Sequence, residues 1–264
     1  MFLARKSFYI FLGARVLNFI AFFGGLTSLG LQAVFLIPGK PFGARRIFEQ
    51  AKKIGVDSFF IVTLVSFFIG MIMALQTAYI MQKMSSEIYI ASIVAVSLVR
   101  ELGPVITALI VAGRSGAGIT AEIGTMTVTE QVDALVTLGS NPIKYLVVPR
   151  FLSLTIMLPI LTIFANAIGI FGGYLICVYR LSIRSSIYLN MTFSSLIYKD
   201  LFTGLIKTVF FGMIIALVAC YHGLKVVGGA EGVGKETTKS VVDSFIMIIV
   251  ADCFFTALFY FFLK

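Results

Sequence analysis

Residues 98–130 read LVRELGPVITALIVAGRSGAGITAEIGTMTVTE and place a neighbouring arginine and glutamate, Arg100 and Glu101, inside an apolar run. A segment rich in glycine, alanine and serine follows, and then a short amphipathic segment with acidic residues. An ionisable side chain costs several kcal/mol near the centre of a bilayer, so such residues are kept there for pairing or for function. The stretch therefore predicts a membrane-spanning helix that carries charge, joined to a segment outside the membrane.

The composition of the whole chain agrees with this prediction. Of the 264 residues, 59% are hydrophobic and 12% are charged, whereas about a quarter of the residues of a soluble domain are charged. Several apolar runs reach the roughly 20 residues that cross a bilayer core as a helix. They are continuous rather than alternating, which excludes a β-barrel. The net charge of +9 comes mostly from loops, where basic residues set topology and contact anionic lipid, so we do not expect nucleic-acid binding.

The apolar runs predict five transmembrane helices, over residues 56–80, 88–113, 151–178, 201–221 and 241–262. The charge of the loops places the N-terminus in the cytoplasm and the C-terminus outside, although the outer loop 179–199 is also basic. We expect residues 222–239 to form a flexible cytoplasmic connection. Its segment GAEGVGKE (229–236) nearly matches a phosphate-binding loop, but Glu236 replaces the required hydroxyl residue and no strand precedes it.

Residues 7–37 form an apolar run that allows two interpretations, a transmembrane span or an interfacial or re-entrant "elbow" helix. Both of its flanks are basic: Arg5 and Lys6 precede it, and Lys40, Arg45, Arg46, Lys52 and Lys53 follow. Basic short segments stay in the cytoplasm, and a segment with both ends inside cannot cross an odd number of times. We therefore favour the elbow helix.

The spans hold four charges that need partners. Arg100 and Glu101 point about 100° apart on a helix and cannot pair well with each other. Lys207 and Asp252 have similar depth in the fourth and fifth spans, so we expect them to pair with each other or to join the first two. Pro104 deprives the Arg100 carbonyl of its helical partner, which predicts a kink beside the charges. The charges either hold the helices together or form a gate or polar spot in a substrate path.

The segment 119–138 is predicted to be an amphipathic helix between the second and third spans. Its acidic side carries Glu122, Glu130 and Asp133. Such a helix docks on a cytoplasmic partner or lies on lipid, and its acids disfavour the second interpretation because the inner leaflet is negative.

Other features point to packing rather than chemistry. The small residues of Gly113–Gly118 and the Gly169-x-x-x-Gly173 pair let helices approach closely. The three cysteines are scattered through apolar segments and predict no disulfide. His222 is the only histidine and has no acids or cysteines clustered around it in the sequence, so we predict no metal site, no cofactor and no catalytic residue.

The chain closely resembles the MlaE permease family over nearly its whole length. The resemblance is carried by the segments LVRELGPVITALIVAGRSGAGITAEIGTM (98–126), TEQVDAL (129–135), NPIKYLVVPRF (141–151), LIKTVFF (205–211) and ADCFFTAL (251–258). It implies that residues 1–264 form one permease domain, the homodimeric core of an ABC transporter in the bacterial inner membrane. On this resemblance we expect the transporter to move phospholipids between the inner and outer membranes and thereby to maintain outer-membrane lipid asymmetry. A separate cytoplasmic ATPase drives it, a periplasmic MCE-domain hexamer sits above it, and a small STAS-type accessory protein commonly binds the ATPase.

The resemblance also implies roles for particular residues. The family's lipid pocket lies between the subunits along the first two spans and maps onto Met73, Gln76, Met81, Leu98 and Leu102. The family's coupling helix maps onto Ile119–Leu138, where we expect ATPase contacts from Glu122, Thr125, Glu130 and Asp133. Thr125 and Val128 depart mildly from the family pattern, while the four intramembrane charges match it. Two rival functions are a proton-coupled secondary carrier that uses Glu101 or Asp252, and a membrane-embedded lipid enzyme.

Overall fold

A computed structural model describes residues 2–37 and 43–262, with the side chains of residue 17 and of the described residues from 20 onward, and within these ranges every regular element is helical. Five helical runs are long and apolar enough to cross a membrane: Ala44–Lys83, Glu87–Val128, Ile143–Tyr179, Tyr198–Leu224 and Gly229–Phe261. These runs confirm the five predicted spans. The helix that precedes them contains a shorter apolar segment, Ile20–Leu36.

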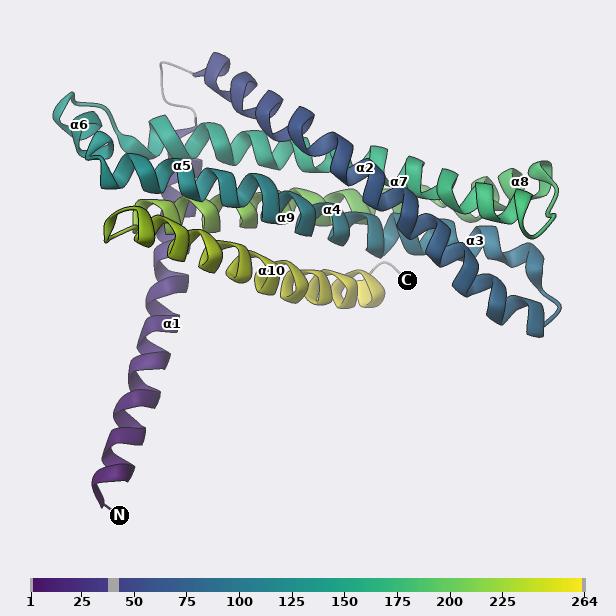
Figure 1. Ribbon diagram of the computed structural model, residues 1–264, viewed down its shortest axis with the longest axis horizontal. Coiled ribbons are helices and arrows are strands. Elements are labelled where there is room, and N and C mark those ends of the chain that lie inside the picture. Colours follow the sequence, from purple (N-terminus) through teal and green to yellow (C-terminus); the bar gives the residue numbers. More distant parts are fainter. Residues whose placement is uncertain (1, 38–42, 263–264) are drawn as a thin grey trace.

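The elements follow in simple order. They are α1 (Phe2–Leu36), α2 (Ala44–Lys83), η1 (Glu87–Tyr89), α3 (Ile90–Ser97), η2 (Leu98–Leu102), α4 (Gly103–Val111), η3 (Ala112–Gly116), α5 (Ala117–Val128), α6 (Gln131–Thr137), η4 (Ile143–Val147), α7 (Val148–Tyr179), α8 (Ser185–Ser195), α9 (Tyr198–Leu224) and α10 (Gly229–Phe262). The five candidate spans run along the same general direction, with α6 at one end of the bundle and α8 at the other (Figure 1).

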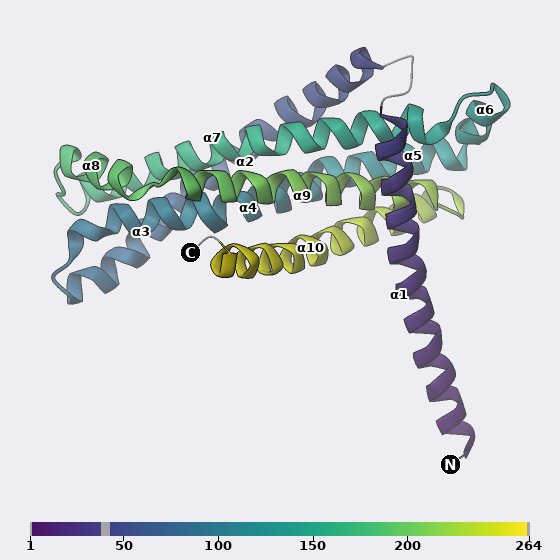
Figure 2. The same cartoon turned by 180° about the vertical axis from the view of Figure 1, so that it is seen from behind.

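Helix α1 runs across the direction of the bundle, and its N-terminus points away from it (Figures 1 and 2). Its C-terminal part packs on α9 near the α6 end. A bilayer aligned with the five spans would hold such a helix in its plane, which supports the elbow interpretation over a sixth crossing. Of the basic flank that suggested this interpretation, Lys40 and the side chains of Arg5 and Lys6 lie outside the described residues.

Helices α2 and α7 form the tightest pair of the bundle, and glycines allow it. A Cβ added to Gly70 would lie 1.8 Å from the Gly169 carbonyl oxygen, and one added to Gly172 would lie 2.3 Å from the Phe67 carbonyl oxygen. Only a residue without a side chain fits where two helix backbones approach this closely. The packing role expected for Gly169 is therefore confirmed, and it operates within the chain.

The second span contains two π-helical turns, η2 and η3, where the i→i−4 hydrogen-bond ladder is widened. The first turn ends immediately before Gly103 and Pro104, and the Gly103 N–H donates to the Leu98 carbonyl. Because Pro104 has no N–H, the Arg100 carbonyl needs another donor, and the Lys207 ammonium lies 3.4 Å from it. A kink was predicted beside Arg100 and Glu101; the structure has a π-helical turn at this point, and a lysine from another span lies beside the Arg100 carbonyl.

Three connections differ from the sequence prediction. The expected single helix over 119–138 is divided, because α5 continues the second span to Val128 and α6 starts after Glu130, whose φ is +59°. The GAEGVGKE segment forms the first turns of α10 rather than a flexible loop, since the chain turns sharply at Gly228 and Gly229, whose φ values are +95° and +71°. The outer loop 179–199 contains the helix α8.

Candidate functional site

A buried lysine is the centre of the intramembrane charges. Lys207 on α9 is 1% exposed, and its ammonium donates to Glu101 Oε2 on η2 and to Asp252 Oδ1 on α10, at 2.5 Å and 2.9 Å. It also donates to the Thr256 hydroxyl at 2.7 Å. The expectation that Lys207 and Asp252 pair or join the second-span charges is confirmed: Lys207, Asp252 and Glu101 form one cluster that links three spans.

Arg100 takes a different partner, as its angular separation from Glu101 requires. Its guanidinium lies 3.6 Å from the carboxylate of Asp200, at the start of α9. The adjacent charges of the second span thus contact α9 at two different heights. Asp200 and Thr256 were not predicted, because neither residue stands out in the sequence until the helices are placed side by side.

Among the described residues, the positive and negative charges around Lys207 do not balance. One ammonium faces two carboxylates, and the Glu101 and Asp252 side chains remain 35% and 21% exposed. Carboxylates open to hydrocarbon carry a large desolvation cost. In a membrane, these two side chains would be more favourably surrounded by polar groups than by lipid tails.

Of the five residues predicted to contact lipid, one is buried and four retain exposed surface. Met73, Met81, Leu98 and Leu102 belong to one apolar cluster between α2, η2 and α7, and Gln76 lies on the exposed face of α2. Leu98 is only 2% exposed and packs against Gly169. In this conformation Leu98 stabilises the protomer, whereas the other four side chains retain accessible surface.

Glu122 has two basic partners within the chain, and its side chain remains 36% exposed. Its carboxylate accepts from Lys53 on α2 and from Arg150 on α7, both at 2.8 Å. Arg150 is 4% exposed and also donates to the Leu146 carbonyl. The spacing of acids in the sequence could not show this, because Lys53 and Arg150 come from distant parts of the chain.

The other predicted coupling residues lie at the surface. Glu130 and Asp133 are exposed at the start of α6, and Thr125 is exposed on α5, where its hydroxyl donates to the Ala121 carbonyl. Helix α6 packs mainly on α5, and it also exposes Val136 and Leu138. It is an amphipathic surface with acids and apolar side chains at one end of the bundle.

The single histidine has two acidic neighbours that lie 14 and 21 positions away in the sequence. His222 Nδ1 and Nε2 each lie 2.8 Å from a carboxylate oxygen, that of Glu236 and that of Asp243 respectively. The sequence analysis placed no acids near it, whereas the return of the chain into α10 brings two. This group fastens α9 to α10, and no metal-binding set of three such side chains is found in the described part of the chain.

Five apolar spans with a charged cluster within them define an integral, multi-pass membrane protein. Comparison with known proteins agrees. The family model "Permease MlaE" matches residues 47–258, and the chain belongs to the MlaE permease family.

Relatives cover nearly the full length of the chain. It is 44% identical over 248 residues to a probable ABC transporter permease protein of Rickettsia felis, which covers 94% of this chain and 96% of the relative. It is 35% identical over 257 residues to the intermembrane phospholipid transport system permease protein MlaE of Haemophilus influenzae, which covers 96% and 97%. A probable ABC transporter permease protein of Synechocystis is 39% identical over 232 residues, with 85% and 88% covered.

Proposed function

We propose that this chain is the transmembrane subunit of an ABC transporter that moves phospholipids between the inner and outer bacterial membranes, powered by a separate ATPase subunit. The observation that carries the proposal is the surface of α6, which lies at the end of a helical run that continues without a break from the charged turn η2. The name of the Haemophilus relative supports phospholipid as the substrate. The chain would reside in the inner membrane with the α6 end in the cytoplasm.

A continuous helical run connects the intramembrane charges with the segment just before α6, so movement of α6 can reach them. Helices α3, α4 and α5 and the turns η2 and η3 form one continuous helical run, and α6 follows it after two residues. The π-helical turns are points where such a run bends or shifts register. A partner ATPase that displaces α6 would therefore reposition Glu101 relative to Lys207.

The open side of the charged cluster supports a homodimer. Only 11% of the residues in the apolar window of α10 are buried, compared with 33% to 44% in the other four spans. Lipid could cover apolar side chains there, but not the accessible carboxylate of Asp252. A second copy would enclose a cavity with the charged cluster at its base. Its contacts with acyl chains would come from Met73, Gln76, Met81 and Leu102.

Further partners follow from the family. An MCE-domain protein would sit on the α8 end, which we place in the periplasm, and a STAS-type accessory protein would bind the ATPase.

Reconstitution tests the proposal. The purified chain is placed in donor vesicles with its ATPase and MCE partners, and transfer of a labelled phospholipid to acceptor vesicles is measured with ATP and with a non-hydrolysable analogue. We expect transfer to depend on hydrolysis and on the ATPase. Transport by the chain alone under a proton gradient would instead support the carrier that uses Glu101 or Asp252, and a changed lipid product would support an enzyme.

The coupling surface is tested separately by charge reversal. Glu130→Lys on α6 is expected to reduce co-purification of the ATPase at least about tenfold, as expected when a charged interface contact becomes repulsive. Glu231→Lys is the matched control, because Glu231 is also exposed near the same end but lies on α10. Equal co-purification of the wild type and both variants would contradict the role of α6.

A further inference from the structure

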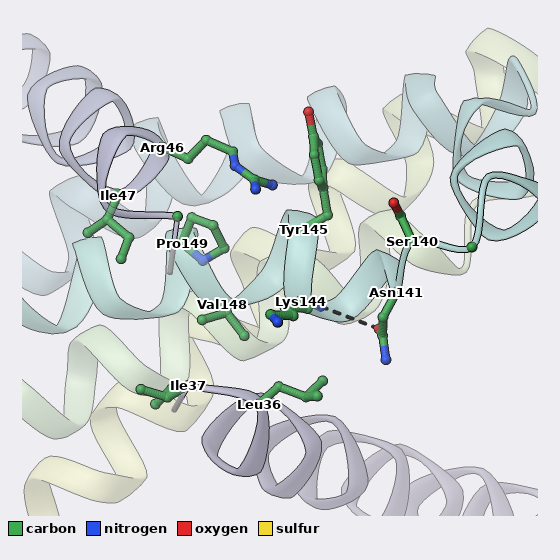
Figure 3. A pocket seen from close by; sticks show the side chains of 12 residues that line it. Leu36, Ile37, Arg46, Ile47, Ser140, Asn141, Lys144, Tyr145, Val148 and Pro149 are labelled. Carbon is green, nitrogen blue, oxygen red and sulfur yellow. Dashed lines mark hydrogen bonds between the residues drawn. The ribbon is translucent and has the colours of Figure 1, made fainter. Parts of the chain in front are cut away.

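A cavity of about 330 Å³ lies beside the point where α1 approaches the bundle. Its walls come from the end of α1, the first turn of α2, and the connection from α6 into α7. Figure 3 shows the Arg46 side chain reaching from α2 toward Tyr145, while Leu36 and Ile37 lie on the opposite side. The volume is within the range of small-molecule sites.

The polar wall of this cavity is cationic. It includes Arg46 and Lys144, and none of the described residues that line it is acidic. The Arg46 guanidinium carbon lies 3.9 Å from the centre of the Tyr145 ring, which fixes its position. Its Nη1 atom is shielded from solvent and has no hydrogen-bond partner among the described residues. Two cationic side chains with no acidic residue beside them in the described lining make the site suited to an anion.

The other wall is apolar, and its position indicates which anion fits. Leu36, Ile37, Val148 and Pro149 line it, and it continues from the apolar helix Ile20–Leu36. The lining residues come from the end of α1 and from the connection that follows α6, so the cavity lies at the α6 end of the bundle. The C-terminal end of α1 meets the bundle there (Figure 2). A ligand with a phosphate ester and an attached apolar tail satisfies both walls.

We propose that this cavity binds the headgroup of an anionic phospholipid from the cytoplasmic leaflet, with the phosphate between Arg46 and Lys144 and the acyl chains along α1. This is a lipid site distinct from the proposed transport surface. Arg46 and Met73 are separated by 27 positions on the same helix, or about 40 Å along its axis. The bound lipid would fasten α1 to α2 and α7, so the site does not require that phospholipid be the transported substrate.

Native mass spectrometry of the full-length chain in detergent tests the proposal. Dioctanoyl-phosphatidylglycerol and dioctanoyl-phosphatidylcholine are titrated separately, and inorganic phosphate is added as a competitor. We expect the wild type to prefer the anionic lipid by about tenfold, and Arg46→Gln with Lys144→Gln to abolish this preference. Arg45→Gln is the matched control, because Arg45 is adjacent in sequence but exposed, pairs with Glu49 and does not line the cavity.

Each outcome decides the proposal. Retained preference in Arg45→Gln together with loss in the double variant supports a defined site. Equal losses in all variants indicate a general surface-charge effect and overturn it, as does equal binding of the two lipids by the wild type. Displacement of the anionic lipid by inorganic phosphate at equal concentration shows a free-phosphate site and also overturns it. The wild-type measurements decide the matter even where the double variant does not fold, and a single Arg46→Gln variant then replaces it.

Discussion

Removal of the Lys207 ammonium is expected to be among the most destabilising single changes in the spans. Glu101 Oε2 and Asp252 Oδ1 lie 2.5 Å and 2.9 Å from Lys207 Nζ, so the two oxygens are at most 5.4 Å apart. Lys207→Met leaves these carboxylates facing each other without a cation. At an effective dielectric constant of about 20, their repulsion amounts to about 3 kcal/mol, which agrees with the cost of breaking a buried ion pair from one side.

The predicted loss is measured as the free energy of unfolding in a detergent titration. Lys239→Met is the matched control, since Lys239 is half-exposed and pairs with Glu236 on the same helix, and its loss should stay below about 1 kcal/mol. Adding Glu101→Gln and Asp252→Asn to Lys207→Met should recover most of the stability, because the remaining groups are neutral. A Lys207→Met variant no less stable than the control, or a triple variant that recovers nothing, would refute this reasoning.

Two further substitutions test the packing and the coupling region. Gly172→Val should lower the free energy of unfolding by about 3 kcal/mol, because the new side chain meets the Phe67 carbonyl. Gly118→Ala should be neutral or slightly stabilising, because no atom lies within 4 Å of the added Cβ. Thermal unfolding in detergent compares the two variants. Glu122→Gln should cost about 2 kcal/mol in the same assay because it weakens the ionic contacts of the buried Arg150. Glu130→Gln should leave stability unchanged, and equal losses at the two glutamates would contradict the separate roles assigned to them.

The sequence by itself determined the class of the chain and the number of spans. Apolar runs of about 20 residues satisfy their backbone hydrogen bonds only as helices in lipid, so the five spans follow from length and composition alone. The disturbance near Pro104 was also predictable, since a missing N–H is a local property. The same holds for the need of Arg100 and Glu101 for separate partners, which follows from helical geometry.

The pairing of Lys207 with Asp252 was expected from their similar depth, but only the tertiary structure decided the partners of the other charged side chains. Glu122 and Glu130 are eight positions apart and look alike in the sequence, yet one is held by Lys53 and Arg150 and the other is exposed. His222 seemed isolated until α10 returned along α9 with Glu236 and Asp243. Such contacts depend on the relative height and rotation of packed helices, which arise from many long-range contacts rather than from any local pattern.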